Sequence, residues 1–269
     1  MLRQPAVSGR FYPSDSTELA ALVRSYAPSA ASQGQIHARA CLVPHAGYLY
    51  SGHVAGAVFA RLALPEKIVL LGVRHYPRGE NAAILSSGAW RTPLGDALID
   101  EELAAKLRSE CPLLREDTVA HATEHSLEVQ IPFLQVLRPN FRFVPIALGS
   151  QRFEELTRVG EGIARALGDT DEEILLLTTS DLNHYEDDAT TRIKDSKAID
   201  RIMALDASGL YATCRDEAIS MCGLGPTVAM LTALNLWGKT APELVRYATS
   251  ADVSGDFSAV VGYAGMIFS

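Results

Sequence analysis

Several features that would mark particular classes of protein are missing from this 269-residue sequence. No run of apolar residues approaches the roughly 18 that a membrane-spanning helix needs. No Lys/Arg-rich stretch is present and the formal net charge is -8, which makes a nucleic-acid backbone an unexpected partner. The N-terminal stretch lacks the apolar segment of a secretory signal. We therefore expect a cytoplasmic protein that binds neither membranes nor nucleic acids.

Cysteines are few and scattered, with no C-x-x-C pair among the four. This pattern fits a reducing compartment better than a disulfide scaffold. Cys41 lies in an apolar run and Cys111 follows a charged helical pattern, so both are expected to be structural. Cys222 stands in "MCGLGP" just before a predicted helix, whose dipole would favour a thiolate with a low pKa. The alternative for Cys222 is a small buried thiol that packs a turn.

Three common enzyme motifs are also absent. The "GKT" at residues 238–240 lacks the first glycine of a P-loop, and it follows a helical pattern instead of a strand. The "GLG" at residues 223–225 lacks the third glycine of a dinucleotide fingerprint. No G-x-S-x-G occurs, which excludes the nucleophile elbow of the α/β-hydrolases.

What the sequence does contain is an alternation of apolar runs and helical patterns. The runs that are apolar on both faces predict buried strands; they lie at 37–44, 66–73, 141–148, 172–180 and 259–268. Helical patterns separate them; these lie at 15–27, 51–64, 99–110, 123–137, 152–167, 192–205 and 225–238. Without linkers or repeats, this predicts a single α/β domain over residues 1–269, with a mostly parallel or mixed central sheet and helices on both faces.

Polar residues follow three of the apolar runs. His45 comes after the first and His75 after the second, while Asp181 follows a later run with His184 three residues on. Open α/β sheets bind ligands at the carboxyl ends of their strands. The two histidines are separated by about one β-α-β unit, so their strands are expected to be parallel and adjacent. The sequence therefore predicts a shared polar or metal site, although a single strand-end histidine is more often bonded to backbone.

A metal site of this kind needs a third ligand, and a carboxylate or a thiolate is the usual partner of histidine. Asp181 and Cys222 are both candidates, and the residues alone do not choose between them. The "HATEH" segment is not a zincin motif, because Glu124 stands directly beside His125. Its helix is predicted to begin near Thr123, which would leave His121 outside it.

Seven short motifs, in order along nearly the whole chain, resemble those of the Memo family, also called AmmeMemoRadiSam system protein B. They are "AVSGRFYPSD", "PHAGYLYSG", "LGVRH", "WRTPLGD", "EHSLEVQIPFL", "TTSDLNHY" and "MCGLGP". Each motif is weak alone, and together they are highly specific. The resemblance implies a fold similar to the LigB-type class III extradiol dioxygenases, which use non-haem iron.

The resemblance also implies a site. Its metal positions fall on His45, His75 and Cys222, with His184 and Asp181 as catalytic residues in the same cleft. The other residues expected to line that cleft are Tyr48, Glu124 and His125. The family is linked to iron, copper and redox activity, so the expected cofactor is Fe(II) or copper, with zinc as a further candidate. The function implied is that of a redox-active metal protein, an oxidoreductase if it is an enzyme.

Two departures bear on that function. Val73 and Arg74 stand where the family usually has proline and a small polar residue, and a guanidinium would oppose a nearby cation unless it points away or pairs with a substrate anion. Cys222 replaces the carboxylate of the dioxygenases, so O2-activating chemistry does not follow from the fold. A non-catalytic module that binds a peptide or protein beside a vestigial metal site is the alternative. A hydrolase or dioxygenase of a small molecule ranks third. Other members of the AmmeMemoRadiSam system are candidate partners.

Overall fold

Strands from both ends of the chain join one mixed sheet in the computed structural model, which describes residues 1–28, 34–168 and 172–269. The main path through the sheet has the order β1-β5-β6-β8-β3-β9-β2-β12-β10, while β11 pairs with β12 and β4 pairs with β7 and β8. The strands are β1 (Leu2–Arg3), β2 (Ala40–Val43), β3 (Lys67–Val73), β4 (Ala82–Ile84), β5 (Ala89–Thr92), β6 (Gly95–Ile99), β7 (Arg115–Glu116), β8 (Arg142–Leu148), β9 (Ile174–Thr179), β10 (His184–Glu186), β11 (Pro242–Thr249) and β12 (Val260–Phe268).

The centre of the sheet is parallel. Strands β6, β8, β3, β9 and β2 all run in one direction, and β12 joins the edge of β2 antiparallel. Parallel strands that are covered on both faces are apolar throughout, which explains why the runs of β2, β3, β8 and β9 are almost wholly buried. The predicted α/β fold with a mixed sheet is confirmed.

One detail of the predicted topology is wrong. Strands β2 and β3 are parallel, as expected, but they are not neighbours, because β9 lies between them and pairs with both. The three strand ends after which His45, Asp181 and His75 stand are therefore side by side. The insertion brings Asp181 between the two histidine-bearing strands.

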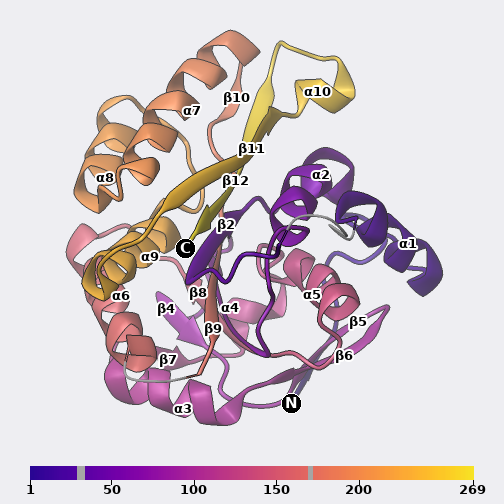
Figure 1. Ribbon diagram of the computed structural model, residues 1–269, viewed down its shortest axis with the longest axis vertical. Helices are drawn as coiled ribbons and strands as arrows, with labels where there is room; N and C mark the ends of the chain where they lie inside the picture. Colours follow the sequence, from indigo (N-terminus) through magenta and orange to yellow (C-terminus); the bar gives the residue numbers. More distant parts are fainter. Residues whose placement is uncertain (29–33, 169–171) are drawn as a thin grey trace.

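Helices cover both faces of the sheet, as predicted (Figure 1). One core cluster packs α3, α6, α7, α8 and α9 against one face, and a second packs α1, α2, α4 and α5 against the other. The helices are α1 (Ser16–Tyr26), α2 (Tyr48–Phe59), α3 (Glu101–Glu110), α4 (Val119–Ala122), η1 (Glu128–Gln130), α5 (Ile131–Leu137), α6 (Phe153–Gly168), α7 (Asp188–Met203), α8 (Ala207–Asp216), α9 (Leu224–Trp237) and α10 (Ala251–Ser254). None of these helices is both long and apolar enough to cross a bilayer.

The segment around "HATEH" differs from the prediction. His121 lies inside the short helix α4, whereas Glu124 and His125 lie in the irregular segment before η1. The helix predicted over residues 123–137 is regular only in its second half, where α5 begins. The carboxylate of Glu124 accepts three backbone or ring N–H groups outside any helix, and these bonds hold the segment irregular.

Candidate metal centre

Two of the candidate ligands are presented directly by strand ends. Pro44 has no backbone N–H to continue a ladder, so β2 stops at Val43 and His45 follows at the edge of the sheet. The backbone N–H of His45 instead donates to Asp181 Oδ1 at 2.7 Å. His75 follows β3 in the same way, and its backbone N–H donates to Glu124 Oε2 at 2.7 Å. Both chain turns are therefore fixed by a carboxylate.

The third candidate comes from a distant part of the chain. Cys222 precedes Gly223, the first residue of the turn into α9. The backbone N–H of Gly223 donates to Ser180 Oγ at 2.9 Å, next to the end of β9. A Cβ at this glycine would lie 2.6 Å from the backbone oxygen of Thr179, too close for any side chain. Only glycine allows α9 to approach β9 this closely, and the approach brings Cys222 to the strand ends.

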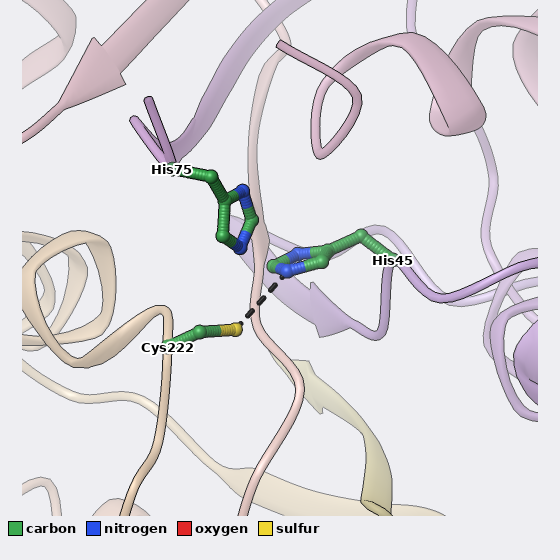
Figure 2. A group of neighbouring side chains, drawn as sticks. All are labelled: His45, His75 and Cys222. Atoms are coloured by element: carbon green, nitrogen blue, oxygen red, sulfur yellow. Dashed lines mark hydrogen bonds between the residues drawn. The ribbon is translucent and has the colours of Figure 1, made fainter. Parts of the chain in front are cut away.

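The side chains of His45, His75 and Cys222 point toward one another (Figure 2). One ligand atom of each lies within 4.8 Å of the others. The sulfur of Cys222 is 3.1 Å from His45 Nε2, and the two imidazole rings meet edge to face with centroids 5.1 Å apart. The two histidines thus lie together as the strand-end argument predicts, and Cys222 lies with them as the family resemblance implies.

Each histidine is held by its other ring nitrogen. His45 Nδ1 lies 2.8 Å from Thr179 Oγ1, and His75 Nδ1 lies 2.9 Å from Glu124 Oε1. Metal-binding histidines commonly use one nitrogen for such a hydrogen bond and the other for the metal. In both residues this arrangement leaves Nε2 for a ligand.

Glu124 and His125 extend the cluster on the side of His75. The ring of His125 stacks on that of His75 with centroids 4.4 Å apart, and its Nδ1 lies 3.6 Å from Glu124 Oε1. Burial opposes ionisation of Glu124, but the hydrogen bond from His75 and the nearby imidazoles outweigh it and lower the pKa of Glu124 to about 2. Glu124 is thus a buried carboxylate held ionised beside two imidazoles.

Asp181 and His184 extend the cluster on the side of Cys222, and the three have ligand atoms within 4.8 Å of one another. The resemblance implies that Asp181 and His184 act together as catalytic residues, with Asp181 orienting the imidazole. The structure gives this role to Ser220, whose hydroxyl accepts the backbone N–H of His184 and whose carbonyl oxygen lies 3.0 Å from Nδ1. Burial raises the pKa of Asp181 to about 7.

The donor set matches what a transition metal requires. Burial, followed by the nearby imidazoles, holds the pKa of His45 well below its usual range, so this ring is neutral and ready to coordinate. Burial also lowers the pKa of His184. In contrast to the expected low value, burial and then the charge of Asp181 raise the pKa of Cys222. Cys222 would therefore lose its proton only on coordination, as metal-binding thiols do.

The sequence singles out two other residues, and the first, Arg74, was expected to oppose a bound cation unless it points away or pairs with a substrate anion. Its guanidinium does not join the ligand cluster: it donates to the backbone oxygens of Arg78 and Gly79 and, at 3.0 Å, to Asn81 Oδ1. These neutral oxygens of the loop that follows His75 fix the position of the guanidinium without neutralising its charge. The potential conflict with a bound cation is reduced because of these contacts.

Tyr48 is the second. It was expected to line the cleft, but its ring is buried between Tyr12 and Phe133, and its hydroxyl donates to the backbone oxygen of Val129 at 2.7 Å. Its place at the start of α2 directs the side chain into the core that lies under this helix. The cleft-lining role predicted for Tyr48 has no support in these contacts.

Sequence reasoning missed two residues that support the cluster. Thr179 contacts His45, and Ser220 contacts His184. Isolated hydroxyl residues occur throughout any chain, so nothing in their sequence context marks them. Thr179 could have been found only from its place at the end of a predicted strand, two residues before Asp181.

The chain is similar to known proteins along nearly its whole length. The family described as Memo-like protein matches residues 3–267. A MEMO1 family protein from Methanopyrus kandleri is 41% identical, with 100% of this chain and 99% of the relative covered. Another from Methanothermobacter thermautotrophicus is 37% identical, with 98% and 99% covered. The crystal structure of an uncharacterized protein from Escherichia coli K12 is similar with a TM-score of 0.58, 13% identity, and coverage of 85% of this chain and 98% of that one. This last likeness concerns the fold alone.

Proposed function

Because this chain belongs to the family of Memo-like proteins, we propose that it holds a redox-active transition metal through His45, His75 and Cys222. The observation that carries the proposal is the convergence of two imidazoles and one thiol within 4.8 Å, each imidazole supported at Nδ1. Two nitrogens and one sulfur suit iron, copper or zinc better than magnesium or calcium. We propose that the metal bound at this site is iron or copper.

Iron or copper held there would supply one-electron chemistry, which no side chain of the cluster provides. The protein's own part is to fix the donors and to handle protons. We assign His184 to proton transfer at Nε2, since its Nδ1 is committed to the carbonyl of Ser220. Asp181 acts as a positioning residue that holds the backbone of His45. The substrate is a small molecule or a peptide, and a cytoplasmic location stays a prediction.

A second candidate function is a non-catalytic module that binds a peptide or protein, with other proteins of the AmmeMemoRadiSam system as candidates. Tyr185, next to His184, is the observation in its favour. This tyrosine is 79% exposed and has a φ of 63°, a left-handed conformation that an aromatic residue rarely adopts. Strained, exposed aromatic residues occur at binding surfaces, where the strain maintains a required direction of the side chain.

Metal analysis distinguishes the two candidates. The protein is purified without chelator, its bound metals are quantified, and the metal-free protein is titrated anaerobically with Fe(II), Cu(I) and Zn(II). The metal proposal expects one equivalent of iron or copper, and uptake abolished in His45→Ala, His75→Ala and Cys222→Ser. His37→Ala, at an exposed histidine paired with Glu173, is the matched control. An absence of uptake, or uptake that survives the three substitutions, would reject the proposal. Partner binding unchanged by the same substitutions would favour the second candidate.

A further inference from the structure

A cavity of about 580 Å³ opens beside the ligand cluster. Cys222 and Ser220 form its wall nearest the metal ligands, and the start of α9 continues that wall. The size lies within the roughly 300–1,000 Å³ of pockets that hold small molecules. The cavity is therefore large enough for a ligand that reaches the cluster from one side.

The charge of the cavity is unusual for this chain. The protein carries a formal net charge of -8, yet Arg74 and Arg215 line the cavity and, among the residues that the structure describes, no carboxylate does. Within the same described ranges, neither arginine takes part in an ion pair. Arg74 donates only to neutral oxygens, and its Nε is buried without a hydrogen-bond partner. Two guanidinium charges therefore face one cavity without a counter-charge from its described lining.

Both arginines are connected to the loop of residues 149–151, Arg74 from the end of β3 and Arg215 from α8. The guanidinium of Arg74 packs against Gly149, where a Cβ would collide with it. Arg215 donates to the hydroxyl of Tyr211 at 3.2 Å, and that hydroxyl donates to the backbone oxygen of Gln151 at 2.6 Å. The carboxylate of Glu155, which is bonded to this loop, is taken up by Ser150 and Arg152. The carboxylate of Glu155 therefore does not neutralise the guanidinium charges of Arg74 and Arg215.

The rest of the lining is suited to an organic molecule. Much of it is apolar, contributed by Val73, Leu148, Leu156, Ile219, Met221, Leu224 and Pro226. The helix α9 begins here without a side-chain cap, and Gly225 at its first turn also lines the cavity. A backbone N–H at a helix start favours an anion, and Gly225 is the residue that offers one here, because Leu224 donates to Met221 and Pro226 has no N–H. An apolar wall with two guanidinium groups in the lining selects a molecule with an apolar body and an anionic end.

We propose that this cavity is the binding site for a small organic anion, whose carboxylate or phosphate is held by Arg74 and Arg215. Planar guanidinium groups recognise both oxyanions. The other end of the ligand faces the metal ligands at Cys222, and only this part of the proposal rests on the proposed function. The anion site itself is defined without metal and is tested without it.

The test uses the full chain, freed of metal, at low ionic strength, because salt screens exposed charges. Benzoate is the probe and benzamide is its neutral control of the same shape, with binding measured by saturation-transfer NMR and calorimetry. Benzoate is expected to bind at least about tenfold more tightly than benzamide, the ratio that one charge-assisted hydrogen bond provides. Equal binding of the two probes would overturn the proposal.

Substitutions locate the site. Arg74→Met and Arg215→Met should each weaken benzoate binding about tenfold and leave benzamide unaffected. Arg91→Met, at an exposed arginine already paired with Asp96, is the control. Arg215 is exposed, so its variant keeps the test valid if Arg74→Met unfolds. Benzoate binding that survives in Arg215→Met, or falls equally in Arg91→Met, would reject the site.

The same assay identifies the source of the anion. Inorganic phosphate is added as a competitor against bound benzoate. Displacement of benzoate indicates that phosphate esters belong to the ligand class, and benzoate binding that withstands phosphate restricts the class to carboxylates. Because metal is absent throughout, failure of this proposal is distinct from failure of metal uptake.

Discussion

At the scale of single residues, buried carboxylates do most of the organising around the candidate metal centre. Glu124 accepts hydrogen bonds from both the backbone and the ring of His75, and also from the backbone of Ser126. One buried side chain thereby fixes the direction of a candidate ligand that is itself the most exposed of the three. The orientation of His75 depends on a residue that would not coordinate the metal.

Substitution of this carboxylate tests that dependence. Glu124→Gln removes the charge and one of its acceptor oxygens, so His75 loses either its ring bond or its backbone bond. We expect metal affinity to fall about 10–100-fold, the usual effect of removing such a partner. Competition with a chromophoric chelator measures it, with Glu116→Gln as the exposed control. Unchanged affinity in Glu124→Gln would show that His75 needs no such support.

The buried histidine His121 should make the stability of the fold depend on pH. Burial lowers the pKa of this histidine from 6.5 to about 4 in the folded state. Since the unfolded chain binds the proton more tightly, the contribution of His121 to stability is fully present above about pH 6.5 and is lost as pH falls toward 4. The loss reaches about 3 kcal/mol for this one group.

Denaturant unfolding at several pH values checks this prediction. His121→Phe keeps a ring against Trp90 and removes the titrating group. The variant should lose less stability than the natural protein between pH 6.5 and pH 4. The site histidines titrate in both proteins, so the difference between the two curves belongs to His121. Parallel curves would mean that His121 accepts a proton without cost.

At the scale of elements, the candidate site depends on the contact between the start of α9 and the end of β9. Gly223 makes that contact, with its N–H on Ser180 and with no space for a Cβ. The position of Cys222 is therefore set by its neighbour in the chain, while burial outweighs the helix dipole that was expected to lower its pKa.

Gly223→Ala is predicted to push α9 away from β9 and move Cys222 with it. Overpacking at such a contact costs about 1–3 kcal/mol. Metal uptake should fall even in protein that circular dichroism shows to be folded. Such a fall would exceed the effect of the stability loss alone. Gly34→Ala, where a Cβ meets no atom within 4 Å, is the control. Normal uptake in folded Gly223→Ala would mean that Cys222 reaches the ligand position by another route.

At the scale of the whole molecule, the N-terminal segment is fastened to the segment that carries Glu124. Arg3 pairs with the buried carboxylate of Glu128 at 2.7 Å and donates to the backbone oxygens of His121 and Glu124. Glu128 also accepts the hydroxyl of Tyr12 at 2.6 Å and two backbone N–H groups. The first strand and the support of His75 are thus parts of one buried polar network.

Glu128→Gln should destabilise the protein by about 3–5 kcal/mol, because it leaves Arg3 charged and buried without its partner. Glu243→Gln breaks the half-exposed pair with Arg61 and should cost at most about 1 kcal/mol. Chemical denaturation of both variants gives the comparison. Similar losses in the two would mean that water replaces Glu128 as the partner of Arg3.

Much of this arrangement could be predicted because it is local in sequence. His45 and His75 each follow an apolar run, and chain direction within a parallel sheet places both at one edge. The insertion of β9 between their strands could not be predicted, since strand pairing is decided by packing across the whole fold. Tyr48 was assigned to the cleft through the family resemblance, but its place in the first turn of α2 directs its side chain into the core. Cys222 was preferred to Asp181 as the third metal ligand only through the family resemblance. Its approach to the two histidines depends on the tertiary contact between Gly223 and the end of β9, which the sequence does not reveal.

The last strand has a consequence for how the protein is made. Strand β12 covers the edge of β2 that β9 leaves open, and it pairs with β2 through Met266–Phe268. While the ribosome is still extending the chain, β2 therefore has a bare edge, although His45 and His75 have long been synthesised. An open edge invites pairing with other nascent chains. A cation captured before Cys222 is synthesised would meet imidazoles without the thiol, so the full ligand set exists only once the chain has grown past residue 222.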